Sequence, residues 1–182
     1  MVLFDGSNVD AWENGVLENG LLKANGTMSK QHFKSYSAHI EFRTPFKPEA
    51  RNQSRGNSDI YHYGRWETQV LDSFGMHPRQ NGCGGIYSIR EPRLNMCLPP
   101  LSWQTYDVDF TAATFNADGQ RTAWPRITVK LNGVLIHEDL ELSKDKTAAA
   151  PIGSPLTDEG GPLFLQDHWN PVYFRNIWVL PK

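Results

Sequence analysis

The segment Gly56–Asp72, with the sequence GNSDIYHYGRWETQVLD, carries the pattern that decides the fold of this chain. Two short strands joined by a turn at 62–64 are expected within it. Because side chains alternate across a strand, Glu67 and Gln69 project from the same face of the second strand. A carboxylate and an amide side by side on a sheet, near aromatic residues, suit a ligand rich in hydroxyl groups. The segment therefore predicts a β protein with a face for carbohydrate.

Short strands recur along the rest of the chain. Asn19-Gly20 and Asn132-Gly133 lie between apolar runs, and Asn-Gly is the strongest short signal for a β-hairpin. Residues 37–42 alternate between apolar and polar, and 104–111 and 172–180 also have the composition of strands. Many short strands separated by Gly, Pro and Asn turns predict a β-sandwich or a barrel.

Helical signals are scarce, and two stretches have the composition of long loops. No window of ten or more residues keeps an apolar repeat at helical spacing. The polar stretch 45–56 and the stretch 143–162, rich in Lys, Ala, Pro and Gly, are expected to be loops. Long loops in a compact β domain are often functional, although mobile surface is the commoner explanation.

Composition limits the class of protein. The 182 residues suit one domain, 1–182, that can bury a core without metals. A net charge of -2 and a pI of about 6.3 disfavour nucleic acid and anionic membranes as partners. No apolar run approaches the roughly 20 residues of a membrane-spanning helix, and the N-terminus carries no cleavable signal.

The chain has two cysteines, Cys83 and Cys97. Two buried thiols are one interpretation, and a disulfide is the other. Their loop-like surroundings favour the disulfide, which would close a short loop and contribute about 3 kcal/mol in the chain-entropy model. Such a bond would also indicate an oxidising compartment.

A series of motifs runs in order from Leu3 to Leu180. They are Leu3-Phe4-Asp5-Gly6 followed by Trp12, Gly56-Asn57-Ser58, Glu67–Asp72, Gly84-Gly85-Ile86-Tyr87, Trp103–Asp107, Leu131-Asn132-Gly133, Leu163–His168 and Phe174–Ile177. The ordered set resembles the family catalogued as domain of unknown function 1080 (DUF1080). That family is described as 3-keto-disaccharide hydrolase, or as 3-keto-glucoside 1,2-lyase and 3-keto-2-hydroxy-glucal hydratase.

This resemblance implies a concanavalin-A-like jelly-roll β-sandwich of two antiparallel sheets, one of them concave. It also implies breakdown of bacterial polysaccharides or glycosides, usually by exported proteins, so a periplasmic or extracellular location is expected and a cytoplasmic one stays open.

Two positions depart from the family pattern. Asp59 replaces the usual Gly after Asn-Ser, and Trp169 replaces a frequent Gly after Asp-His. Both leave the identity of the sugar open, and Trp169 could form a stacking platform for it.

The resemblance also implies a reaction. The ketone at C3 of a 3-keto sugar acidifies the proton on C2, so a base can remove that proton and the C1 glycosidic oxygen can depart. Water then adds back, which gives elimination and hydration or net hydrolysis. Such a site needs a base, a group that stabilises the enolate, and an acid for the leaving group.

Glu67 is the first candidate for the base or for a metal ligand; the alternative is a structural carboxylate paired with Arg65 or Arg43. Asp72, at the end of the strand, could share in catalysis or cap a turn. No cofactor is certain. Oxygen ligands such as Glu67 and Asp72 with loop carbonyls would favour Ca²⁺ or Mg²⁺, and the six histidines lack the spacing of a zinc site.

His168, beside Asp167, is a candidate for acid–base work near neutral pH, although a histidine in a loop is more often only solvated. For Arg90 and Arg93 the alternative is a salt bridge with Glu91 at the rim. The residues expected to bind substrate are Asn57, Tyr61, Gln69, Tyr87, Arg90, Arg93, Gln166, Asp167 and Trp169.

Two other functions remain open. A non-catalytic, lectin-like module would use the same fold, since fold does not determine function; the presence of both Glu67 and His168 favours an enzyme. An endo-glucanase of this fold would place two Glu about two positions apart on one strand, and Gln69 argues against it. The oligomeric state stays open.

Overall fold

The computed structural model covers residues 1–182, and its regular elements are all strands apart from one short 3₁₀ helix. Its elements are β1 (Val2–Phe4), β2 (Trp12–Glu13), β3 (Val16–Glu18), β4 (Leu21–Lys23), β5 (Thr27–Ser29), β6 (Tyr36–Arg43), the 3₁₀ helix η1 (Asn52–Ser54), β7 (Ser58–His62), β8 (Trp66–Val70), β9 (Gln104–Thr111), β10 (Thr114–Phe115), β11 (Arg121–Ala123), β12 (Arg126–Leu131), β13 (Val134–Glu141), β14 (Phe164–Leu165) and β15 (Tyr173–Pro181).

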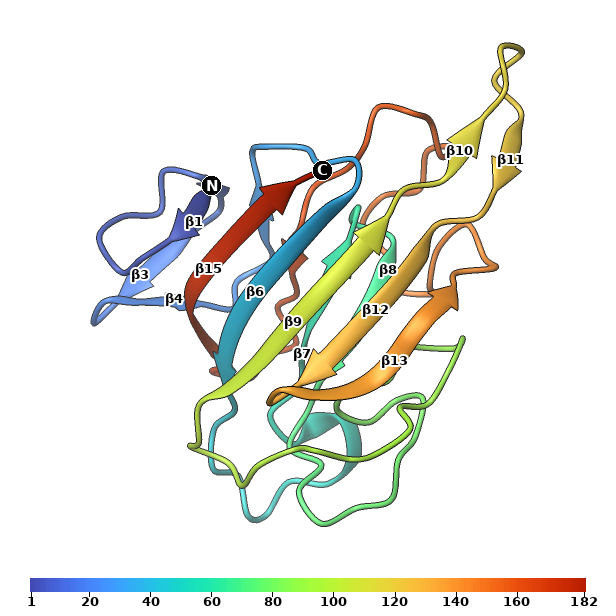
Figure 1. Cartoon of the computed structure of the whole chain (residues 1–182). Coiled ribbons are helices and arrows are strands. Elements are labelled where there is room, and N and C mark those ends of the chain that lie inside the picture. Colours follow the sequence, from blue (N-terminus) through green and yellow to red (C-terminus); the bar gives the residue numbers. More distant parts are fainter.

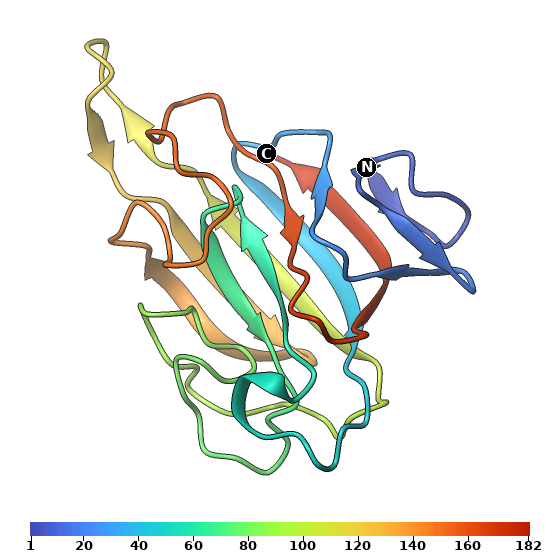
Figure 2. The ribbon, with the colours of Figure 1, turned by 180° about the vertical axis from the view of Figure 1, so that it is seen from behind.

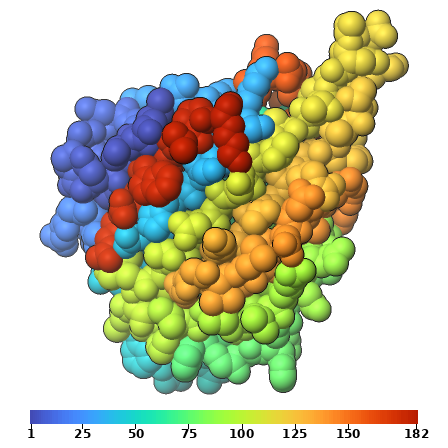
Figure 3. All heavy atoms as spheres, viewed as in Figure 1, coloured from blue at the N-terminus to red at the C-terminus, as the bar shows by residue number.

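Two antiparallel sheets pack face to face as a jelly-roll β-sandwich, which confirms the predicted fold class (Figure 1). The larger sheet has the order β13-β12-β9-β6-β15-β4-β3, with β1 paired to β15. The smaller sheet has the order β2-β5-β14-β7-β8. A separate hairpin of β10 and β11 projects from one end of the body (Figure 3). No helix is long and apolar enough to cross a bilayer.

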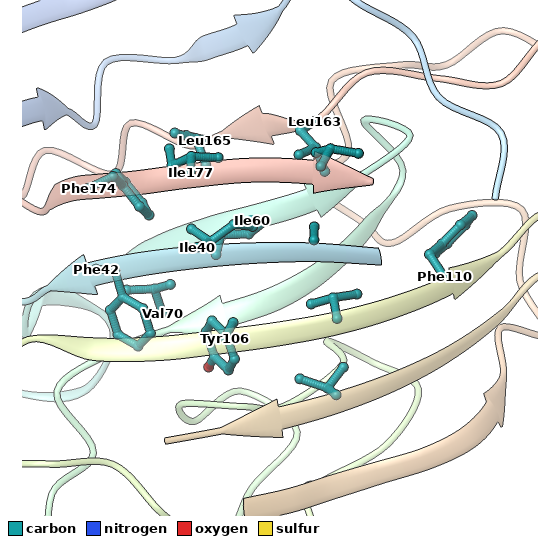
Figure 4. Packing of buried hydrophobic residues seen from close by; sticks show 14 of the residues in the cluster. Ile40, Phe42, Ile60, Val70, Tyr106, Phe110, Leu163, Leu165, Phe174 and Ile177 are labelled. Carbon is teal, nitrogen blue, oxygen red and sulfur yellow. The ribbon is translucent and has the colours of Figure 1, made fainter. Parts of the chain in front are cut away.

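The core fills the space between the two sheets and follows from strand alternation. In β6, Ala38, Ile40 and Phe42 are buried and the residues between them are only partly buried, as the alternating sequence predicts. Figure 4 shows Ile40 and Phe42 against Ile60 and other apolar side chains of the facing sheet. Each such side chain contributes about 1.5–3 kcal/mol on burial, so the two sheets hold each other in place.

The two Asn-Gly hairpins form as expected. Glu18 pairs with Leu21 across Asn19-Gly20, and both turn residues have positive φ, 53° and 74°. Asn132-Gly133 repeats this geometry, with φ of 52° and 79°, between β12 and β13. Positive φ at both central residues defines the type I′ turn, whose twist matches that of the strands. These local signals therefore set the register of both hairpins.

The disulfide prediction is wrong, because Cys83 and Cys97 are free thiols. Both are buried, 2% and 6% exposed, at the edge of the core. The Cys83 Sγ lies 3.4 Å from the Tyr106 hydroxyl, and the Cys97 Sγ donates to the Leu98 carbonyl at 3.4 Å. Their loops pack onto the sandwich, so the thiols have partners there without a covalent bond. Without the disulfide, the cysteines no longer support an oxidising compartment.

Candidate active site

The hairpin of β7 and β8 turns at residues 63–65, one position later than the predicted 62–64, because His62 is still part of β7. The His62 carbonyl accepts a hydrogen bond from the Arg65 N–H at 3.0 Å, and Tyr63 and Gly64 have φ of 59° and 62°. Gly64 is required at this point, because a Cβ there would lie 2.8 Å from the Ile152 side chain and positive φ disfavours larger residues. The tight turn sets the pairing of every residue in the two strands.

That pairing assembles one polar face. Tyr61 lies opposite Glu67, and Asp59 lies opposite Gln69. The alternate residues of the hairpin, among them Ile60, point into the core. The four polar side chains therefore stand on the outer face of the smaller sheet. Figure 2 shows the ribbon with this sheet in front of the larger one. The predicted placement of Glu67 and Gln69 on one face is confirmed.

Glu67 is a buried carboxylate that is held by neutral donors. The Tyr61 hydroxyl donates to its Oε2 at 2.6 Å, and the Gln69 amide donates to its Oε1. Burial raises the pKa of Glu67, and the hydrogen bonds from Tyr61 and Gln69 partly oppose that rise. Arg65 does not pair with it, since its guanidinium donates to the carbonyls of Ser154 and Pro155 at 2.7 and 3.1 Å. The structural ion pair considered for Glu67 is absent.

Asp59 is a second buried acid beside Glu67, and the sequence analysis missed it as a functional residue. It is 1% exposed, its Oδ1 accepts from the Val70 N–H at 2.8 Å, and it stands on the same face of the hairpin as Glu67. Burial, and next the negative charge of Glu67, raise the pKa of Asp59 well above its usual range. Of the two acids, Asp59 therefore has the more strongly raised pKa and keeps its proton to higher pH than Glu67, which is the candidate proton acceptor.

A cavity of about 300 Å³ opens over these acids, a size at the lower end of the range for small-molecule sites. Glu67, Asp59 and Gln69 lie among the residues that surround it, and no Arg or Lys does. The full lining is Gln53, Asn57, Asp59, Glu67, Gln69, Asn81, Tyr87, Ala148, Ala149, Gln166 and His168.

Three residues that line this cavity each carry a buried amide oxygen with no hydrogen-bond donor. These oxygens are the Oδ1 of Asn57, the Oε1 of Gln69 and the Oε1 of Gln166. Each amide nitrogen is in use, since Asn57 donates to Gln53, Gln69 to Glu67 and Gln166 to Tyr61. Buried acceptors without donors are costly unless a ligand supplies them. Hydroxyl groups are suitable donors for all three.

Loops from distant parts of the chain close the walls. The covering loop, residues 142–163 between β13 and β14, is tied to the hairpin by Thr147, whose hydroxyl donates to the Arg65 carbonyl at 2.9 Å. On the free edge of β8, the Glu67 carbonyl accepts from the Tyr87 N–H at 3.1 Å. Gln166 is placed by its N–H, which donates to the Asp59 carbonyl at 2.9 Å. The long loop expected at 143–162 is thus part of the site.

The comparison with known families agrees with this geometry. The family of the 3-keto-alpha-glucoside-1,2-lyase-like domain matches residues 1–180. The chain belongs to that family. A crystal structure of a candidate glycosyl hydrolase from Parabacteroides distasonis ATCC 8503 is similar over all of this chain and 83% of its own, with 34% identity and a TM-score of 0.87.

Two further candidate glycosyl hydrolases from the same organism share the fold of this 3-keto-alpha-glucoside-1,2-lyase-like domain. Each is 18% identical, with TM-scores of 0.65 and 0.68, and they are covered over 92% and 98% of their own chains and 99% and 100% of this one. No curated protein matches the chain. Family membership makes the chain a glycosyl-hydrolase-like, carbohydrate-active protein.

In this lyase-like domain, His168 lines the cavity and its sequence neighbour Asp167 does not. The Asp167 carboxylate is exposed and accepts from the Trp169 N–H at 2.8 Å. The His168 ring packs edge-on against the ring of Trp169 at 5.5 Å, and it makes no hydrogen bond within the chain. Trp169 is 85% exposed at this position. Asp167 therefore shapes the turn and lies outside the cavity lining.

Three other predicted site residues lie elsewhere. The Asp72 carboxylate accepts from the Arg55 Nε at 2.7 Å and lines a neighbouring cavity, so it is not brought together with Glu67. Arg90 and Arg93 line a separate groove beside β13, where Arg93 pairs with Glu138 at 3.0 Å. No cluster of three or more His, Cys, Asp or Glu side chains is present, and the Ca²⁺ or Mg²⁺ ligand set imagined around Glu67 and Asp72 does not assemble.

Tyr61 also has a different role from the expected one. It is fully buried and does not line the cavity; instead its hydroxyl connects Gln166 to Glu67.

Asp59 could have been found from the sequence. With the three-residue turn 63–65, centred on Gly64, antiparallel pairing places residue 59 opposite residue 69, on the face of Glu67.

Proposed function

We propose that this protein cleaves 3-keto-glycosides by removing the C2 proton with Glu67. The observation that carries the proposal is a buried carboxylate at the base of a sugar-sized cavity, with neutral hydrogen-bond partners and no cation. Burial raises the pKa of Glu67, and a stronger base removes a carbon-bound proton more readily. The family description supports the 3-keto-glucoside as the substrate class.

The reaction then follows in balanced steps. The C2–H bond breaks and its proton goes to the Glu67 carboxylate, while the electron pair moves onto the C3 ketone oxygen as an enolate. The enolate returns its electrons to form the C1–C2 double bond, and the C1–O bond breaks. A proton goes to the departing oxygen, and His168, half-buried in the cavity wall, is our candidate for its donor. Addition of water across the double bond completes net hydrolysis.

The separation of the acids argues against ordinary glycoside hydrolysis. Retaining and inverting enzymes hold two carboxyl groups about 5–5.5 Å and about 6.5–9.5 Å apart, to flank the glycosidic bond. Asp59 and Glu67 stand on one face of the β7–β8 hairpin and line the same cavity, so they do not lie on opposite sides of a glycosidic bond. The pair therefore acts on one atom of the substrate, as base and proton reservoir.

The cavity walls supply recognition in this proposal. The side-chain amides of Asn57, Gln69 and Gln166 line the cavity and are the groups that would meet sugar hydroxyls. Tyr87 lines the same space. Trp169, exposed beside His168, provides an apolar surface at the rim on which a sugar ring can stack. A periplasmic or extracellular site of action is part of the proposal and rests on the family resemblance alone.

A lectin-like module is the second candidate, and the exposed Trp169 and the three free acceptors favour it, because binding needs nothing more. Turnover separates the two functions. The test follows release of free sugar from 3-keto-glucosides and 3-keto-trehalose by wild type and Glu67→Gln, with and without chelator. The Gln side chain keeps the shape of Glu67 but cannot accept the proton.

Glu67→Gln should lower turnover by about 10²–10⁴-fold, the usual contribution of a general base. The variant should keep the melting temperature of the wild type or exceed it, since it removes a buried charge. Full activity in the variant would exclude Glu67 as the base. Binding of unmodified glycans with no turnover of any keto sugar would establish the lectin-like function instead.

A further inference from the structure

A second cavity adjoins the one that holds Glu67. Its volume is about 200 Å³, and it shares Gln53 and Asn81 with the first cavity as common wall. The Gln53 amide donates to the Asn81 carbonyl at 2.8 Å and accepts from the Asn57 amide at 2.6 Å. Gln53 thus ties the two loops that separate the cavities. A ligand longer than one sugar unit can extend past this residue from one space to the other.

The two cavities differ sharply in charge. The first has two acids, Asp59 and Glu67, and no Arg or Lys in its lining. The second is lined by Arg51, Arg55 and Arg79 and by a single acid, Asp72. The remaining residues around the second cavity are amides, small polar residues and apolar side chains. A negative group on a ligand would be repelled from the acid pair and attracted to the second cavity.

Only one of the three arginines is neutralised. The Arg55 Nε donates to Asp72 at 2.7 Å, and the Asp72 side chain is 1% exposed, so these two charges are committed to each other. The Arg51 guanidinium donates only to the carbonyls of Pro48 and Ala50. Arg79 makes no side-chain hydrogen bond or ion pair and is exposed. Two guanidinium groups without acids therefore border this space.

We propose that the second cavity is a subsite for the leaving unit of the glycoside, and that it selects a leaving unit with an anionic substituent. This inference rests on the proposed function of the first cavity, because the leaving unit is the other half of the glycoside whose 3-keto sugar would bind there. A carboxylate, phosphate or sulfate on the sugar matches the planar fork of Arg51 or Arg79, which can hold two oxygens at once.

The test is equilibrium binding, which needs no turnover. Glucose, glucuronic acid, glucose 6-phosphate and inorganic phosphate are titrated calorimetrically into Glu67→Gln protein, alone and combined with Arg51→Gln and Arg79→Gln. Arg93→Gln is the matched control, since Arg93 is an exposed arginine in a separate groove. At least one of the two anionic sugars should bind about tenfold tighter than glucose, the effect of one charge-assisted hydrogen bond.

The preference should disappear when Arg51 and Arg79 are both replaced and should survive Arg93→Gln. Comparison of the carboxylate with the phosphate identifies which anion the leaving unit carries. Equal affinity for glucose and both anionic sugars would overturn the proposal, and so would inorganic phosphate binding as tightly as glucose 6-phosphate, which would mean an anion site with no sugar recognition. These binding measurements do not require the Glu67 carboxylate. They therefore test the subsite proposal separately from the proposed reaction.

Discussion

Replacement of Asp59 by asparagine should stabilise the protein at neutral pH. The Asp59 carboxyl is buried beside Glu67, and its pKa is raised well above the usual range, first by burial and then by the Glu67 charge. The folded protein therefore holds a proton that the unfolded chain has already released. Taking up that proton costs folding free energy whenever the pH exceeds the unfolded pKa. An asparagine side chain is neutral without a proton and avoids this cost.

The size of the gain follows from the linkage relation. Each pH unit above the unfolded Asp pKa of about 3.9 costs about 1.36 kcal/mol for as long as Asp59 stays protonated. The cost is therefore about zero near pH 4 and grows with pH until Asp59 releases its proton. The amide introduced by Asp59→Asn can still accept from the Val70 N–H, so this hydrogen bond is kept.

The sign is fixed by the direction of the shift. A raised folded pKa gives a contribution that is fully present below the unfolded pKa and is lost as the pH rises toward the folded pKa. Wild-type stability should thus fall from about pH 4 upward at this site, whereas that of Asp59→Asn should not. Urea unfolding of both proteins at about pH 4 and at neutral pH measures the difference.

Asp118→Asn serves as the matched control, because Asp118 lies on an exposed turn and its carboxyl makes no hydrogen bond or ion pair. This control should show no gain at either pH. A loss of stability in Asp59→Asn at neutral pH would refute the argument, and an equal change at both pH values would show that the effect does not come from proton uptake.

Three further predictions follow from the same contacts. Tyr61→Phe removes a hydrogen bond that lowers the pKa of Glu67, so the acid limb of the pH–rate profile should move to higher pH, and an unmoved limb would exclude Glu67 as the titrating base. Arg65→Ala removes two hydrogen bonds to the covering loop and should cost about 1–3 kcal/mol, with faster proteolysis confined to that loop; cleavage at the wild-type rate would contradict this role. Titration with a thiol reagent and no reductant should count two thiols, Cys83 and Cys97, only after denaturation, and a count of zero would restore the disulfide.

Local pattern was enough to predict most of the sandwich. The Asn-Gly turns at 19–20 and 132–133 impose a twist that only antiparallel strands follow, and the alternation of residues 37–42 decides which face is buried. The strand 104–111 was predicted with its observed bounds. The two-residue strands β2 and β14 were missed, because segments so short carry no periodicity and exist only through their neighbours in the sheet.

The candidate site divides in the same way. The sequence by itself determined that Glu67 and Gln69 share a face, because parity along a strand is a local property. The register of the three-residue turn 63–65 then places Asp59 and Tyr61 opposite them. Only the tertiary structure decided what surrounds that face. Asp72 turns to Arg55, Arg90 and Arg93 stand in another groove, and the thiols stay free, because loops distant in the sequence pack against the hairpin and their positions are set by long-range contacts that no local pattern encodes.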